Sequence, residues 1–315
     1  MTTKSTPYSE LSTDRKKFFE RIKLRQWDAF YGYLFVAPQV IGFIMIVLVP
    51  LIAVFVFSTQ QRNLLSGAVT PVGADNFEFM MTKDPFFKTV LVNSLIFTAG
   101  LVPLNVVLAL VLAILLTQKI RGMIFFRTLF FAPVVTSAVA WAVVWRFLLQ
   151  ENSGINALLA SIGIDGPNWL REQDWAMFSV IVTRVLKNVG LNMIIFMAAL
   201  QNIPEAYTDA AKVDGANAWH RVRFITIPLL SPTIVLVILI TIIGSLQAFD
   251  HILLMTGGGP ANATNVLVYY VYFQAFKIFQ TGYASALASV LFVITFILTI
   301  AQWLVRRRFV YLEIT

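Results

Sequence analysis

The stretch DAAKVDGANAWHRVRFITIPLLSP, residues 209–232, is a polar interruption in a chain that is otherwise mostly apolar. Pro204 precedes it and suits the first turn of a helix, where its missing N–H costs nothing. The helix dipole favours the carboxylate of Asp209 near the N-terminal end of a helix. Ala210 and Ala211 are small, strong helix formers. The start of the stretch therefore predicts a short helix with a smooth face that another surface could approach closely.

The second half of the stretch predicts a turn and a return to the apolar chain. Asp214 and Gly215 form a turn signal that ends the first helix. From Ala216 a short amphipathic segment leads to Pro228, just before the next apolar run. A helix, a turn and a second segment would make a compact docking element.

Composition places this element in a membrane protein. The 315 residues are 58% hydrophobic and 13% charged, whereas soluble domains are about 45–50% apolar and about 25% charged. The net charge is +8, but the basic residues form short clusters between apolar runs. Such clusters set membrane topology, so no nucleic acid is expected as a partner. With no cysteine and two histidines, neither disulfides nor a metal site are expected.

Six stretches are long enough to cross a bilayer core as helices, which takes about 20 apolar residues. They run approximately over Tyr33–Ser58, Val90–Thr117, Thr128–Leu149, Trp175–Leu200, Leu229–Phe249 and Tyr283–Val305. A further run, Val266–Phe276, is too short to span, so we expect it at the interface or over the external mouth. Because a full-length span follows the polar first thirty residues, the N-terminal region predicts a retained anchor and not a cleaved signal peptide.

The distribution of basic residues predicts the orientation. Sixteen of the 24 lysines and arginines fall on one side of the six spans and five on the other. Positive residues concentrate on the cytoplasmic side, so both termini are expected there. This divides the chain into a cytoplasmic segment 1–32, a permease domain 33–305 that includes the cytoplasmic loop 202–228, and a cytoplasmic tail 306–315.

The docking element resembles the EAA loop of ABC importer permeases. An acid-Ala-Ala triplet, three residues, a glycine and then nine residues lead to Ile-x-Ile-Pro, with Asp209 in place of the usual glutamate and Ile227 in place of leucine. In that family the loop helix inserts into a groove of the ATP-hydrolysing subunit. The resemblance therefore assigns ATPase coupling to Asp209, Ala210, Ala211, Asp214, Gly215 and Ala216.

Other segments are similar to the sugar-permease branch of that family, including YLFVAPQVIGF (33–43) and FDHILLMTGGGPANAT (249–264). The resemblance implies the all-α, six-helix transmembrane domain of an ABC type I importer in the bacterial cytoplasmic membrane. It also implies three kinds of partner: a second, similar permease subunit, two ATP-binding-cassette subunits and an extracytoplasmic solute-binding protein. The glycine cluster at 257–259 lacks the G-K-[ST] ending of a phosphate-binding loop, so ATP and Mg would bind the partner ATPase and this chain would have no cofactor or catalytic residue of its own.

Polar residues within the spans mark a candidate substrate path, because charges in hydrocarbon normally face a cavity or a partner. On the fourth span the candidates recur at helical spacing: Arg184, Lys187, Asn188, Leu191 and Asn192. On the fifth span they are Thr241 and Ser245, with Gln247, Asp250 and His251 near its outer end. In the resembling importers the helices on either side of the EAA loop line the sugar path. Trp141, Trp145 and Tyr269 are candidate sugar-facing aromatics.

Several alternatives remain open at this point. The polar groups could satisfy one another or contact the partner permease, since small polar residues also join membrane helices. The solute could be glycerol-phosphate, a polyol or an oligosaccharide, and the basic pair Arg184 and Lys187 would suit a phosphate. A stand-alone secondary transporter would need inverted repeats and a coupling-ion site, neither of which is visible in the sequence. A membrane scaffold would not explain the polar stripe of the fourth span.

Overall fold

The computed structural model describes residues 27, 30–62, 67–118, 121–151 and 153–309. It falls into two units, one up to Val56 and one from Phe57 onward, and each is described by itself. Most of the predicted cytoplasmic segment 1–32 and the last six residues of the predicted tail lie outside the described residues.

A single long helix, Phe30–Ser58, forms the described part of the first unit and reaches into the second. It contains a π-helical stretch, η1 (Ile44–Leu48), followed by α2 (Val49–Ser58). The wide π turn comes two residues before Pro50, which has no N–H to donate to the preceding turn. This helix is long and apolar enough to cross a bilayer.

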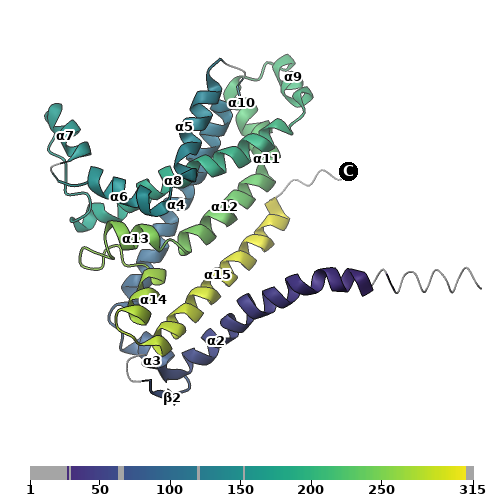
Figure 1. Ribbon diagram of the computed structural model, residues 1–315. Coiled ribbons are helices and arrows are strands. Elements are labelled where there is room, and N and C mark those ends of the chain that lie inside the picture. Colours follow the sequence, from purple (N-terminus) through teal and green to yellow (C-terminus); the bar gives the residue numbers. More distant parts are fainter. Residues whose placement is uncertain (1–26, 28–29, 63–66, 119–120, 152, 310–315) are drawn as a thin grey trace, which may run out of the picture. The chain divides into compact units, whose positions relative to one another are not determined.

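The second unit is almost entirely helical, in agreement with the predicted all-α class (Figure 1). Its helices are α3 (Asp75–Thr82), α4 (Phe87–Leu116), α5 (Met123–Val135), α6 (Ala138–Leu148), α7 (Gly154–Ser161), α8 (Gln173–Gln201), α9 (Glu205–Val213), α10 (Ala218–Arg221), η2 (Val222–Thr226), α11 (Ile227–Leu229), α12 (Ser231–Leu246), α13 (Asp250–Met255), α14 (Leu267–Phe276) and α15 (Thr281–Phe309). One antiparallel pair of short strands, β1 (Gln60–Arg62) and β2 (Val69–Pro71), was not predicted.

Helix α8 lies at the centre of this unit, against α4, α5, α12 and α13. Its buried face includes Val180, Met193 and Phe196, which contribute to two separate apolar clusters. At Gly190 the backbone of α5 comes so close that an added Cβ would lie 2.2 Å from the carbonyl oxygen of Phe130. Such close approach through a small residue is how membrane helices gain packing contacts without a hydrophobic driving force.

The predicted first, second, fourth and sixth spans correspond to long helices: Phe30–Ser58, Phe87–Leu116, Gln173–Gln201 and Thr281–Leu304. The third is broken, which the sequence did not predict, because helices α5 and α6 meet at 102°. The fifth contains α12, and the segment Ala218–Leu229 that precedes α12 meets it at 70°. Within the described residues the number of spans therefore reaches six only if each bent pair counts as one.

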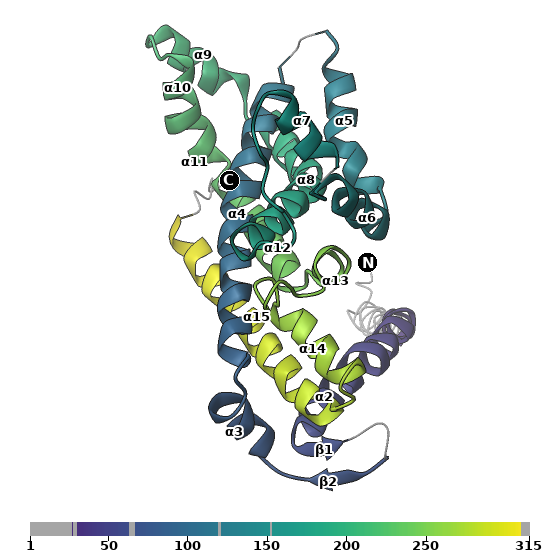
Figure 2. The same ribbon diagram turned by 90° about the vertical axis from the view of Figure 1, so that its left-hand side faces the viewer.

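Helix α14 is, as predicted, too short to span a bilayer, and it packs on α15 and α4. The link between α3 and α4 is joined to this pair through Asp84. Its carboxylate accepts hydrogen bonds from the hydroxyls of Tyr270, at 2.9 Å, and Tyr283. Burial raises the pKa of Tyr270 above its ordinary value, so the hydroxyl remains a donor. Figures 1 and 2 both place α3 and the strands at the end of the unit opposite α9.

Candidate functional site

The predicted docking element folds as a short helix closed by a turn. Helix α9 begins directly after Pro204 and ends at Val213. Two backbone bonds close it: the N–H of Gly215 donates to the carbonyl of Lys212 at 3.1 Å, and that of Ala216 to Ala211 at 2.9 Å. This pair of bonds is the Schellman motif, which needs a left-handed residue after the helix. Gly215 supplies it with φ = +75°.

Large apolar side chains are exposed at the end of α9 and in the segment that follows it. Val213 is 88% exposed, and Trp219 and Phe224 in the following segment are each 64% exposed. That segment consists of α10, η2 and α11, and Asn217 caps its start by accepting from the N–H of His220 at 2.9 Å. Exposed apolar groups gathered in this way mark interaction surfaces.

The six residues predicted to couple to an ATPase have different environments. Asp209 is exposed and pairs with Lys212 at 2.8 Å, one turn along the same helix. Ala210 is exposed whereas Ala211 is buried against the rest of the loop. Asp214 is the C-cap of α9. The outward face therefore combines a carboxylate with a small side chain, which leaves room for a partner to approach the backbone.

The predicted polar stripe of the fourth span separates into three parts in the structure. Arg184, Asn188 and Leu191 follow one partly open face of α8, and Leu191 is 44% exposed. Lys187 and Asn192 are both buried. At about 100° of rotation per residue they lie about 140° apart, one on either side of the open face. Only the first three residues therefore face away from the core of the unit.

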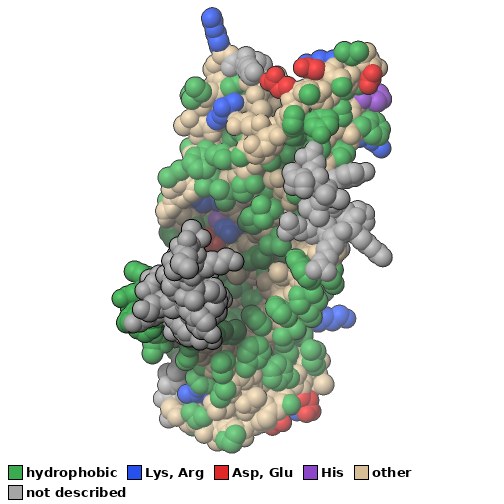
Figure 3. All heavy atoms as spheres, turned by 90° about the vertical axis from the view of Figure 1, so that its right-hand side faces the viewer, with side chains coloured by type: hydrophobic (Ala, Val, Ile, Leu, Met, Phe, Trp, Pro, Cys, Tyr) green, Lys and Arg blue, Asp and Glu red, His purple; other side chains and the backbone are tan. Residues whose placement is uncertain are grey.

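Arg184 joins α8 to α13 through a charged cluster. Its Nη1 atom lies 3.3 Å from Oδ1 of Asp250 and 3.0 Å from Nδ1 of His251. His251 is fully buried, and its Nε2 has no hydrogen-bond partner among the described residues. On the face shown in Figure 3, a small group of charged side chains lies in a hollow among predominantly apolar ones. The structure thus brings together Arg184 and Asp250, which the sequence placed on different spans.

Lys187 contacts the junction of α5 and α6, where the predicted third span is broken. Its Nζ atom donates to the carbonyl oxygens of Pro133 and Thr136, at the junction of α5 and α6. Helix α5 ends here at an extended Thr136, so the carbonyls at its end lack the donors of a continuing helix, and such groups need a donor inside a membrane protein. Nζ also lies 5.9 Å from the centre of the Trp141 ring. In this structure the lysine is satisfied by the protein itself.

Asn192 belongs to a buried network that joins three helices. Its amide donates to Oδ1 of Asn105 on α4 and, at 3.0 Å, to Oγ1 of Thr241 on α12. Ser245 adds a link from α12 to α4 through Thr98, at 2.9 Å. Asn105 was missed by the sequence interpretation, although an isolated amide within an apolar span is itself a signal for an interhelical bond.

The remaining candidates lie at the edges of this region. Gln247 is exposed just beyond the end of α12. The Trp141 ring lies 5.7 Å from that of Trp145, and its Nε1 donates to the carbonyl of Thr183 on α8 at 3.0 Å. Tyr269 lies in an aromatic group with Phe249. These contacts fix the aromatic rings against neighbouring helices.

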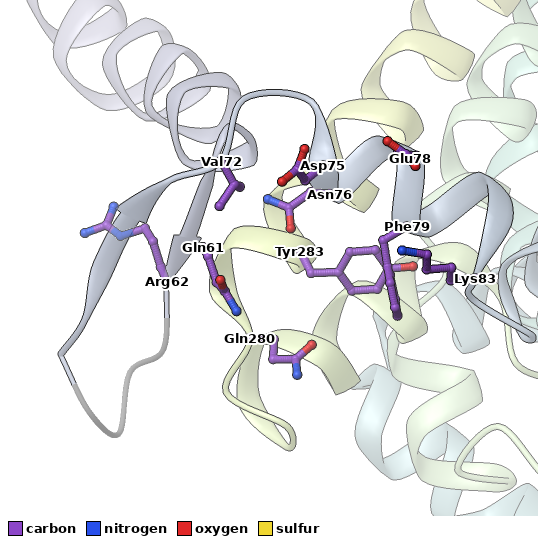
Figure 4. A pocket seen from close by; sticks show the side chains of 10 residues that line it. All are labelled: Gln61, Arg62, Val72, Asp75, Asn76, Glu78, Phe79, Lys83, Gln280 and Tyr283. Atoms are coloured by element: carbon purple, nitrogen blue, oxygen red, sulfur yellow. The ribbon is translucent and has the colours of Figure 1, made fainter.

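A polar hollow of about 540 Å³ opens at the α3 end of the unit (Figure 4). Amide, charged and aromatic side chains line it, including Gln61, Glu78, Lys83 and Tyr283. Asn76 fixes its wall because its Nδ2 donates to the carbonyls of Ser58, at 2.8 Å, and Gln60, at 3.0 Å. None of the residues that line this hollow belongs to α8.

The described residues thus form a helical bundle with membrane-length helices, buried polar links and an exposed helix-turn loop at one end, which is an arrangement typical of a membrane transport subunit. The chain belongs to the family described as binding-protein-dependent transport system inner membrane component, which matches residues 91–311, and within it to the carbohydrate ABC permeases.

Relatives from several bacteria align over most of the chain. It is 35% identical over 277 residues to the probable ABC transporter permease protein YesP of Bacillus subtilis, covering 87% of this chain and 89% of the relative. It is 33% identical over 293 residues to the lactose transport system permease protein LacF of Rhizobium radiobacter, covering 91% of this chain and 97% of the relative. The fold is similar to that of a chain in the crystal structure of a bacterial alginate ABC transporter in complex with an alginate pentasaccharide-bound periplasmic protein. The TM-score is 0.76 and the sequence identity is 23%, and the match covers 92% of this chain and 97% of the other.

Proposed function

We propose that this chain is the membrane-spanning permease subunit of an ATP-binding-cassette importer that moves a carbohydrate across the cytoplasmic membrane. Related permeases are described as carrying lactose and arabinooligosaccharides, which supports a sugar or oligosaccharide as the solute. Both termini and the α9 loop would lie in the cytoplasm, in accordance with the distribution of basic residues.

The observation that carries this proposal is the short link between α8 and α9. Helix α8 bears the open polar face at Arg184 and Asn188 and ends at Gln201, and three residues separate it from α9, which begins at Glu205. The distance from Asn188 to the end of α8 is about 20 Å along the helix axis. Movement of a partner bound at α9 would therefore reach the solute face through this short link and the rigid helix α8.

The proposal requires other subunits. ATP and Mg would bind and react on two ATP-binding-cassette subunits, while a second, similar permease would complete the solute path from the other side. An extracytoplasmic solute-binding protein would deliver the solute, and the hollow at the α3 end offers a polar surface of suitable position for it. Lipid would cover the apolar faces that remain.

Substitutions at Gly215 test the coupling role. Gly215→Val forces a β-branched residue into a left-handed conformation, which costs at least about 1–2 kcal/mol, whereas asparagine tolerates this conformation. An added Cβ would meet no atom of this chain, so the effect is one of backbone conformation. In the reconstituted complex we expect Gly215→Val to lower solute-stimulated ATPase activity and uptake about tenfold, and Gly215→Asn to retain most of both.

Equal, wild-type activities in both variants, with the ATPase subunits still bound, would contradict the assignment of α9 as the coupling element.

A further inference from the structure

We propose that the carried solute is a sugar bearing a carboxylate, and that Arg184 binds this carboxylate. The proposal rests on the transport function proposed above and names the class of solute that the open face of α8 would recognise.

The first argument is charge balance. Arg184 and Lys187 contribute two positive charges to the middle of α8, and Asp250 is the acidic side chain that faces Arg184. Asp250 is also the only acidic residue in the chain between Asp214 and Glu313. A charge within a membrane protein requires a partner of opposite sign or a set of hydrogen bonds. Asp250 neutralises one of the two positive charges, and Lys187 is held by hydrogen bonds to backbone carbonyls. The cluster therefore keeps a net charge of one positive unit, which favours an anionic solute over a neutral one.

The second argument is the geometry of the guanidinium group. Arg184 contacts both Asp250 and His251 through the single atom Nη1. Its Nε is buried and has no hydrogen-bond partner among the described residues. A guanidinium presents five donors in a planar fork, and its edges accept carboxylates through two parallel hydrogen bonds. The Nη2 donors, which are not buried and likewise have no partner among the described residues, are thus left for a second carboxylate.

The third argument is the character of the neighbouring side chains. Asn188 lies one turn from Arg184, about 6 Å along the helix. It is half-buried, and its amide makes no hydrogen bond with any residue in the described part of the chain, so it can donate to and accept from hydroxyl groups. Leu191 extends the same face with an exposed apolar side chain. By contrast, the buried Lys187 and Asn192 already have protein partners.

A single carboxylate fits this site better than a phosphate. A phosphate monoester carries about −1.5 to −2 charges at neutral pH, which would exceed the surplus of one positive charge. The other possible source of a carboxylate is a side chain of the second permease subunit. In that case Arg184 would be required for assembly of the complex, whereas a solute site is required only for uptake.

The test uses the complete complex in proteoliposomes, with its partner permease, ATPase subunits and binding protein. A panel of uronate oligosaccharides from plant and algal polysaccharides is offered in native form and with every carboxyl group reduced to an alcohol; a sugar phosphate forms a third arm. We expect ATP-dependent uptake of an acidic member, with uptake of its reduced counterpart at least about tenfold lower. Arg184→Gln is expected to lower uptake of the acidic sugar about tenfold or more, as for the loss of hydrogen bonds to a charged group.

Three variants make the result specific. Arg171→Gln, at an exposed arginine outside this face, should transport normally. The double variant Arg184→Gln with Asp250→Asn leaves no unpaired buried acid and should show the same loss of the acidic sugar with the complex intact. Asn188→Ala should lower uptake of the acidic sugar without dissociating the complex.

The outcomes separate the two proposals. Uptake of the reduced sugars at the native rate, unchanged by Arg184→Gln, would overturn the carboxylate site and leave carbohydrate import standing. Preference for the sugar phosphate, or loss of the partner permease from both Arg184 variants, would also overturn it. If none of the acidic, reduced or phosphorylated sugars moved, the carboxylate site would be refuted; if lactose and arabinooligosaccharides also failed to move, carbohydrate import itself would be refuted.

Discussion

Replacing Lys187 by methionine separates a structural role from contact with the solute. The methionine side chain is of similar length and apolar, but it removes the donor for the carbonyl oxygens of Pro133 and Thr136. The Pro133 carbonyl also accepts from the N–H of Thr136, at 3.3 Å, so only the Thr136 carbonyl loses its donor. An acceptor left without a partner inside the protein costs about 1–3 kcal/mol. The matched control is Lys212→Met, whose exposed ion pair with Asp209 is worth about 0–1 kcal/mol.

The assay is the fraction of purified complex that stays intact after heating, together with the ratio of uptake rates for two sugars. Since 1 kcal/mol corresponds to about 2–4 °C in domains of 150–250 residues, Lys187→Met should lower the midpoint of thermal dissociation by at least about 2 °C. Lys212→Met should leave it nearly unchanged. The uptake ratio should stay at the wild-type value in both. An unchanged midpoint combined with an altered ratio would show that Lys187 contacts the solute and does not hold the α5–α6 break.

Two further substitutions test the packing around α8. Gly190→Ala would bring a Cβ to 2.2 Å from a backbone carbonyl oxygen of α5 and should sharply reduce the yield of folded protein. The control Gly244→Ala, whose Cβ would meet no atom within 4 Å, should not reduce it, and equal yields of the two variants would contradict the close approach. Asn192→Leu should destabilise the protein by about 1–3 kcal/mol, because the buried groups of Asn105 and Thr241 lose their partner; thermal unfolding in detergent at the wild-type midpoint would show that this network contributes nothing.

Long apolar runs and the docking loop were predictable because their signals are local. Twenty or more apolar residues suffice to indicate a membrane-length helix, and the turn at Gly215 depends on a backbone preference of that residue alone. The structure shows helices at the first, second, fourth and sixth predicted spans and a Schellman turn at Gly215.

The broken third span could not be predicted in the same way because it depends on contacts between distant residues. Pro133 by itself permits a kink. The bend of 102° between α5 and α6, however, is accompanied by hydrogen bonds from Lys187, 54 residues away, to the carbonyls at the junction. Likewise, the i, i+3 and i, i+4 spacing placed Lys187 and Asn192 in one stripe with Arg184. A set of residues covering 140° of a helix is too wide for a single face, and packing of α5 on one side and of α4 and α12 on the other assigns its two edges to the protein core.

Cross-linking through α9 tests the central claim, that this loop couples the permease to an ATPase, most directly. The chain has no cysteine, so a single Val213→Cys variant, at a side chain that is 88% exposed, gives a unique thiol in this subunit. In the assembled complex it should form a cross-link to an ATP-binding-cassette subunit, with a yield that changes when ATP is added, whereas Val69→Cys on β2 should form none. Failure of Val213→Cys to cross-link in an active complex, or equal cross-linking from Val69→Cys, would contradict the account.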